Sequence, residues 1–142
     1  MNTLLLATFL TCFTPNSQNV HVLPQNVGAI QDLISGDFDG NGNKDYALQV
    51  LLPKPVAGPR ERIAVVFLRQ GTSYAPFVLA SGSVDPGLEL GLHLVKKGSK
   101  GKDFELDVEF TYPFDAIDIV SEKGSVTYLW KGGRFQAIIT AD

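Results

Sequence analysis

Five residues with oxygen-bearing side chains are closely spaced between positions 37 and 45, in the stretch DFDGNGNKD. They are Asp37, Asp39, Asn41, Asn43 and Asp45. Calcium takes about six to eight oxygen ligands, and alternate residues of a tight loop can direct them to one centre. Asn43 would supply its backbone carbonyl and the others their side chains. Because carboxylates this close repel one another without a cation, the spacing predicts a calcium (Ca²⁺) loop over 37–45.

Two glycines support this interpretation, because Gly40 and Gly42 let the backbone curl through dihedral angles that other residues avoid. The loop differs from an EF-hand, since Leu48 stands where the bidentate glutamate is required and the following residues form a strand pattern. The alternative is an ordinary turn that binds no metal, because Asp, Asn and Gly are common turn residues.

β-Strands must position this loop, and the sequence predicts an all-β fold of antiparallel hairpins with a C-terminal meander. Pro76 places its strand at a sheet edge or at a bulge, because proline lacks a backbone donor. Gly132 and Gly133 predict a two-residue turn of the primed type. Residues 103–112 alternate strictly between polar and apolar, as in a half-buried strand. The predicted strands are 46–52, 62–69, 74–80, 88–95, 103–112, 115–121, 125–130 and 134–140.

Before the loop, the apolar spacing within 20–34 also allows a short helix, although Gly28 disfavours it. Neither a second Asp-rich loop nor an internal repeat occurs, which argues against a propeller. The chain is therefore expected to form one β domain over 18–142, preceded by a signal peptide at 1–17.

The stretch GDFDGNGNKDYALQVLL resembles the calcium loops of FG-GAP and VCBS repeats, closely over 34–50. The resemblance implies that the residues matching Asp37, Asp39, Asn41 and Asp45 bind calcium through their side chains. It also implies that the hairpin over 62–80 corresponds to part of one repeat. More loosely, the whole chain resembles small exported bacterial proteins with a single such loop. Asn41 departs from the family pattern, which commonly has aspartate there, and this reduces the expected affinity.

Composition and length narrow the class further. The 142 residues include 44% hydrophobic and 19% charged residues, which indicates a globular chain. The net charge is −3 and the basic residues are scattered, so no nucleic-acid binding is expected. The apolar stretch 4–13 has the length of a signal-peptide core and is too short to span a bilayer, which predicts an exported, periplasmic or secreted protein that is not transmembrane. Lipid attachment at Cys12 is an alternative.

Catalytic patterns are weak, and we expect no enzymatic activity. His21 and His93 are the two histidines, and no nucleophile motif accompanies them. Asp115 and Asp118 are three residues apart in a predicted strand, so they would face opposite sides.

The sequence thus favours a non-enzymatic, exported calcium-binding or interaction module whose partner is another protein or a surface polysaccharide. One alternative is a small secreted or periplasmic enzyme inhibitor or immunity protein, in which an acidic strand face or an inter-strand loop enters a basic cleft. That face would carry Asp103, Glu105, Asp107 and Glu109. Another alternative is a carbohydrate-binding module, which would require Tyr128 or Trp130 to be exposed.

Overall fold

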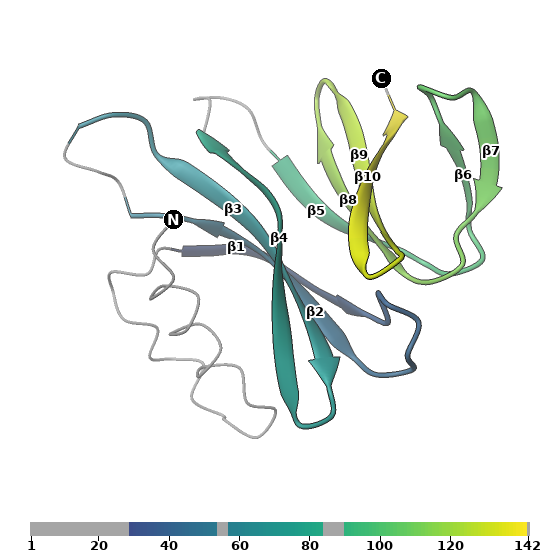
Figure 1. Ribbon diagram of the computed structural model, residues 1–142. Helices are drawn as coiled ribbons and strands as arrows, with labels where there is room; N and C mark the ends of the chain where they lie inside the picture. Colours follow the sequence, from purple (N-terminus) through teal and green to yellow (C-terminus); the bar gives the residue numbers. More distant parts are fainter. Residues whose placement is uncertain (1–28, 54–56, 84–89, 142) are drawn as a thin grey trace.

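The computed structural model describes residues 29–53, 57–83 and 90–141 (Figure 1). This part of the chain consists of ten antiparallel β-strands, which confirms the all-β prediction. The strands are β1 (Ala29–Gly36), β2 (Asp45–Leu51), β3 (Glu61–Gln70), β4 (Ser73–Ser83), β5 (Leu90–Val95), β6 (Lys100–Asp103), β7 (Val108–Thr111), β8 (Ala116–Ser121), β9 (Gly124–Lys131) and β10 (Arg134–Ala141).

The first sheet is a meander in the order β1-β2-β3-β4. Its two central strands, β2 and β3, have four and six consecutive buried residues, respectively, so these strands are buried on both faces of the sheet. Pro76 lies on β4, an edge strand, and the register between β3 and β4 shifts between Ala64 and Val65. Of the two alternatives predicted from this proline, the edge position is confirmed, whereas Pro76 itself pairs in register with Phe67 and the shift lies nearer the end of the strand.

The second sheet has the order β10-β9-β8-β5. Gly132 and Gly133 join β9 to β10 with φ angles of 60° and 82°, so both glycines adopt the left-handed conformation of the predicted turn. A separate hairpin of β6 and β7 interrupts the chain between β5 and β8. The Phe104 amide donates to the Ile139 carbonyl at 3.0 Å, which fixes this hairpin beside β10.

Two sequence predictions fail in the described part. The strand expected over 103–112 is broken by a turn at 104–107, because Asp103 Oδ1 accepts hydrogen bonds from the amides of Glu105 and Leu106. Asp107 takes a left-handed φ of 53° there. The short helix considered for 20–34 is wrong from Ala29 onward, where β1 begins. The rest of that range lies outside the described residues, as do the predicted signal peptide and Cys12.

The main core lies between the two four-stranded sheets, which pack against each other in Figure 1. Ala47, Val66 and Leu68 from the first sheet meet Leu92 and Ile117 from the second. Phe77, Trp130 and Phe135 add edge-to-face ring contacts, with centroids 5.0–5.9 Å apart. Phe38, from the loop between β1 and β2, is fully buried in the same cluster. The candidate calcium loop is therefore anchored to the core by its own second residue.

Candidate metal site

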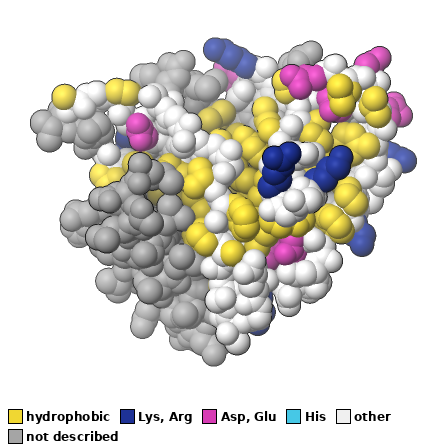
Figure 2. Space-filling model, in the orientation of Figure 1, with side chains coloured by type: hydrophobic (Ala, Val, Ile, Leu, Met, Phe, Trp, Pro, Cys, Tyr) yellow, Lys and Arg dark blue, Asp and Glu magenta, His cyan; other side chains and the backbone are white. Residues whose placement is uncertain are grey.

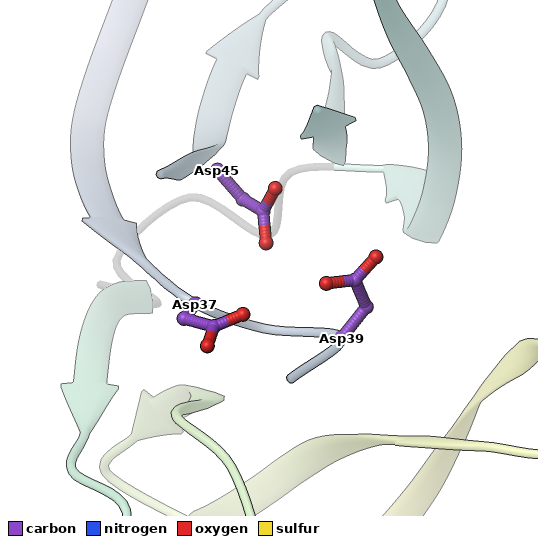
Figure 3. Close-up of side chains that lie close together, drawn as sticks. All are labelled: Asp37, Asp39 and Asp45. Atoms are coloured by element: carbon purple, nitrogen blue, oxygen red, sulfur yellow. The ribbon is translucent and has the colours of Figure 1, made fainter. Parts of the chain in front are cut away.

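Three carboxylates meet where β1 turns into β2. Asp37 and Asp39 lie in the connecting loop, and Asp45 is the first residue of β2. Each offers an oxygen within 4.8 Å of the other two. Figure 3 shows the three side chains pointing toward one shared space. The structure thus brings together three of the five residues selected from the sequence, in the arrangement expected for ligands of one ion.

Asp45 is the most deeply placed member of this group, with no exposed surface. Its Oδ2 accepts a hydrogen bond from the Phe38 amide and its Oδ1 one from the Arg69 amide, both at 2.8 Å. Burial raises the pKa of Asp45, and the negative charges of Asp39 and Asp37 raise it further, against the lowering effect of the two backbone hydrogen bonds. A cation among the three carboxylates would relieve this repulsion and favour the ionised form.

The Asp37 carboxylate provides the observation that points most specifically to metal binding. Its Oδ2 accepts a hydrogen bond from the Gly42 amide at 3.0 Å. Its Oδ1 is buried and has no hydrogen-bond partner among the described residues. Leaving a buried carboxylate oxygen unpaired is costly, and such atoms usually have an explanation in an ion or a water molecule. The free oxygen belongs to the residue that the sequence places at the first ligand position, so the donor set fits a hard cation.

Asn41 and Asn43 are bound into the loop in a different way. The Asn41 backbone amide donates to Asp39 Oδ1 at 3.1 Å, and its side-chain nitrogen donates to Asp39 Oδ2 at 2.9 Å. The same nitrogen donates to the Arg69 carbonyl at 3.2 Å, which ties the loop to β3. Asn41 Oδ1 accepts from the Asn43 amide at 2.7 Å. These bonds order the loop, whereas direct coordination by Asn41 and Asn43 stays a prediction.

The loop glycines explain the tight path of the backbone. Gly40 and Gly42 have φ angles of 76° and 82°, as their selection from the sequence requires. Gly40 has a second constraint, because a Cβ at this position would lie 2.2 Å from Cε1 of Phe114. The Phe114 ring therefore covers the loop at this glycine, and a side chain there would displace it.

Sequence reasoning missed the residues that attach the loop to the second sheet. Asp115 Oδ2 accepts from the Asp37 amide at 3.2 Å and from Lys96 Nζ at 3.3 Å, and its Oδ1 accepts from the Lys97 amide at 3.0 Å. Burial by itself would raise the pKa of Asp115, but these hydrogen bonds and the Lys96 charge lower it overall.

Asp115 thus stays ionised and holds the Asp37 backbone to the turn after β5. In the sequence it is the first residue of the predicted strand 115–121, where it is considered only as a catalytic residue, and it lies 78 positions from Asp37. No local spacing signal points to that pairing, because the contact depends on how the two sheets pack.

The aromatic surface expected for a carbohydrate-binding module and the acidic strand face expected for an inhibitor both differ from what the sequence predicted. Tyr128 and Trp130 are only partly exposed and pack into the cluster between the sheets. Of the four acidic residues expected on one strand face, Glu105 and Asp107 lie in the turn between β6 and β7. Asp107 forms an ion pair with Lys102. The described residues therefore form no continuous acidic strand face.

Comparisons with known proteins add no relative. No protein-family model, curated protein or solved structure matches this chain. The likeness to FG-GAP and VCBS loops therefore continues to rest on the sequence over 34–50, and the candidate metal site rests on the geometry of its three carboxylates.

Proposed function

We propose that this chain is a non-enzymatic calcium-binding module in which the ion fixes the turn between the first two strands. The observation that supports this most is the buried, unpartnered Oδ1 of Asp37 beside two further carboxylates. Asp37, Asp39 and Asp45 would hold the ion, with the Asn41 side chain and the Asn43 carbonyl completing the shell. Calcium suits this set because it prefers several oxygen donors in flexible geometry.

The proposed role of the ion is structural. The loop is tied to β3 through Asp45 and Asn41, and to the second sheet through Asp115. With no bidentate glutamate, the affinity should resemble that of extracellular modules, with Kd roughly 10⁻⁴–10⁻³ M. At about 1 mM calcium and a Kd near 0.1 mM, binding would stabilise the fold by roughly 1.4 kcal/mol.

Thermal unfolding in EDTA and in millimolar calcium tests the site. Calcium is expected to raise the Tm of the wild-type chain by about 5 °C, because it binds only the folded loop. Asp39→Ala should abolish this increase while changing the Tm in EDTA little, since the hydrogen bonds that Asp39 accepts within the described part of the chain come from the exposed Asn41.

Glu122→Ala serves as the matched control, because Glu122 is an exposed acid outside the loop and its loss should leave the calcium effect intact. An unchanged wild-type Tm on addition of calcium, or an equal calcium effect in Asp39→Ala, would count against the metal site.

Export belongs to the same proposal, since millimolar calcium is a condition met outside the cytosol and the stretch 4–13 has signal-peptide character. The partner would be another protein or a surface polysaccharide. Within the described ranges, no helix has the length and apolar character needed to cross a bilayer.

A second candidate, a small inhibitor or immunity protein, is favoured by the exposed tip of the β6–β7 hairpin. Phe104, Leu106 and Val108 project there, and Leu106 is 72% exposed. Figure 2 shows apolar and acidic side chains gathered at the upper right, where the β6–β7 hairpin lies in Figure 1. Exposed apolar groups on a protruding turn suit insertion into a partner's cleft. On this alternative the turn, rather than a strand face, would make the contact.

Leu106→Ser distinguishes the two candidates. Because Leu106 is exposed, the substitution should change the free energy of unfolding by no more than about 0.5 kcal/mol and leave the calcium effect intact. If the hairpin enters a partner, the variant should lose at least tenfold in affinity for that partner, measured by titration after a pull-down has identified it. Equal affinity of Leu106→Ser and wild type would remove the hairpin from consideration.

A further inference from the structure

A cavity of about 160 Å³ lies between the two four-stranded sheets, away from the acidic loop. The described residues that line it belong to β2, β3 and β4 of the first sheet and to β5 and β8 of the second. Arg62 and Ala64 line it near the start of β3, whereas the loop contacts Arg69 near the end of β3. The calcium proposal makes no use of this space, so the cavity needs its own interpretation.

The cavity forms because side chains are small on this part of the face that the first sheet turns toward the second. Farther along that face, Val66 and Phe77 pair across β3 and β4 and fill the space between the sheets. At the cavity the corresponding pair is Ala64 and Ala80, and Gly82 follows on β4. A Cβ at Gly82 would meet nothing within 4 Å. The resulting volume is close to the roughly 150 Å³ that admits one benzene ring.

The wall of the cavity is mostly apolar and is held in place by a buried polar side chain. Ala64, Leu90 and Ile119 contribute apolar surface from both sheets. Gln49 also lines the cavity and is only 1% exposed. Its Nε2 donates to the Leu90 carbonyl at 2.8 Å, which ties the sheets together beside the cavity. An apolar, preformed wall with a few placed polar groups is typical of small-molecule sites.

Arg62 gives this cavity a positive charge. Its Nε donates to Gln31 Oε1 at 2.9 Å, which fixes the plane of the guanidinium group. Within the described ranges, its two terminal nitrogens have no hydrogen-bond partner. No aspartate or glutamate belongs to the described lining, so no carboxylate neutralises the charge there. An arginine in this state presents two parallel donors, which match the two oxygens of one carboxylate.

We propose that the cavity binds a small carboxylate with a compact apolar body, about the size of benzoate. The carboxylate accepts both terminal nitrogens of Arg62, and the apolar body lies against Ala64, Ala80 and Ile119. The volume limits the body to about one ring. The proposal goes beyond the calcium module and does not depend on it, because the two sites lie toward opposite ends of β3.

Titration of the full chain with sodium benzoate tests the site, followed by heteronuclear NMR in EDTA at constant ionic strength. We expect saturable shifts of the backbone amides of Ala64, Ala80 and Gly82, with a Kd in the roughly millimolar range for a ligand of so few atoms. Benzamide has nearly the same shape but no charge. It should bind about tenfold more weakly, because it forms no ion pair with Arg62.

Three variants separate charge from shape. Arg62→Gln should weaken benzoate binding about tenfold and leave benzamide binding unchanged. Gly82→Leu should abolish binding of both compounds, because the space at its Cβ is open and the added side chain would occupy the cavity. Arg134→Gln is the matched control, since it removes the same charge from an exposed position on β10 and should leave both affinities unchanged.

Four results would overturn the proposal. They are the absence of a saturable shift at the cavity amides, equal affinities of wild type for benzoate and benzamide, equal benzoate affinities of wild type and Arg62→Gln, and undiminished binding by Gly82→Leu. The comparison of the two compounds needs no substitution, so it decides the question even if a variant fails to fold. Because the titration is done in EDTA, failure of the calcium proposal would leave its outcome unaffected.

Discussion

Replacing Asp45 with alanine is expected to lower the free energy of unfolding by about 2–5 kcal/mol, even in EDTA. The Asp45 carboxylate has no exposed surface, and it accepts the backbone amides of Phe38 and Arg69 at 2.8 Å. Its removal leaves two donors without a partner beside the core. The loss of a buried charge offsets part of this cost, which is why the expected range begins well below the sum for two charged hydrogen bonds. The measurement is urea unfolding, together with a Tm expected to fall by about 10 °C.

Asp39→Ala is the control for this prediction, since both residues belong to the carboxylate group but their other contacts differ. In EDTA, Asp39→Ala should cost little, because among the described residues Asp39 accepts hydrogen bonds from the exposed Asn41 alone. In calcium, both variants should lack the stabilisation that the ion gives to wild type. Equal losses for the two variants in EDTA would mean that the buried hydrogen bonds of Asp45 contribute little to stability.

Gly40→Ala is expected to cost about 3 kcal/mol, from two separate causes. A residue with a Cβ pays roughly 1 kcal/mol to adopt a left-handed φ. The new Cβ would also lie 2.2 Å from the Phe114 ring, so that ring or the loop must move, at a further cost of about 1–3 kcal/mol. Calcium should bind this variant more weakly, because the strained position lies directly after Asp39 and before Asp45 in the loop.

Gly42→Ala separates the two causes. Gly42 has a φ of 82°, but nothing lies within 4 Å of the position its Cβ would take. Its loss should therefore be only the backbone part, about 1 kcal/mol. Adding Phe114→Ala to Gly40→Ala should remove the steric part of the cost. The double variant should therefore lose less free energy of unfolding than the sum of the two single losses. Equal costs for the two alanine variants, measured by urea unfolding, would show that the Phe114 ring yields easily.

Most of the fold could be predicted because its strands carry strong local signals. The run over 62–69 is apolar and β-branched, and the structure places it in β3 at the centre of the first sheet. Pro76, which lacks a backbone donor, also predicted the correct edge strand, and Gly132-Gly133 predicted the correct hairpin turn. The prediction for 103–112 was wrong because alternation of polar and apolar residues does not show whether the backbone amides bond to a neighbouring strand or to a side chain. Here the Asp103 side chain accepts hydrogen bonds from two backbone amides that follow it, and a turn forms in place of a continuous strand.

The candidate metal site also has a part that local sequence predicts and a part that it does not. The spacing of Asp37, Asp39 and Asp45 is a local feature, and the structure brings these three together. The contributions of Phe114 and Asp115 come from the segment directly before β8, a strand of the other sheet. Their positions depend on the register and packing of two sheets, which no pattern in a single stretch of sequence encodes.

The order of strands has a consequence for how the chain folds. The first sheet uses four strands that follow one another between Ala29 and Ser83, and β8, β9 and β10 form a second consecutive run. Among the described strands, only the pairing of β5 with β8 must bridge an intervening segment, the one that contains the β6–β7 hairpin. Because short loops cost the least entropy to close, the topology favours early formation of the β3–β4, β8–β9 and β9–β10 hairpins and late closure of β5 on β8. The β1–β2 hairpin has a longer connection over 37–44, where three carboxylates resist approach. A bound ion would then act on the kinetics by lowering the barrier to closing this hairpin.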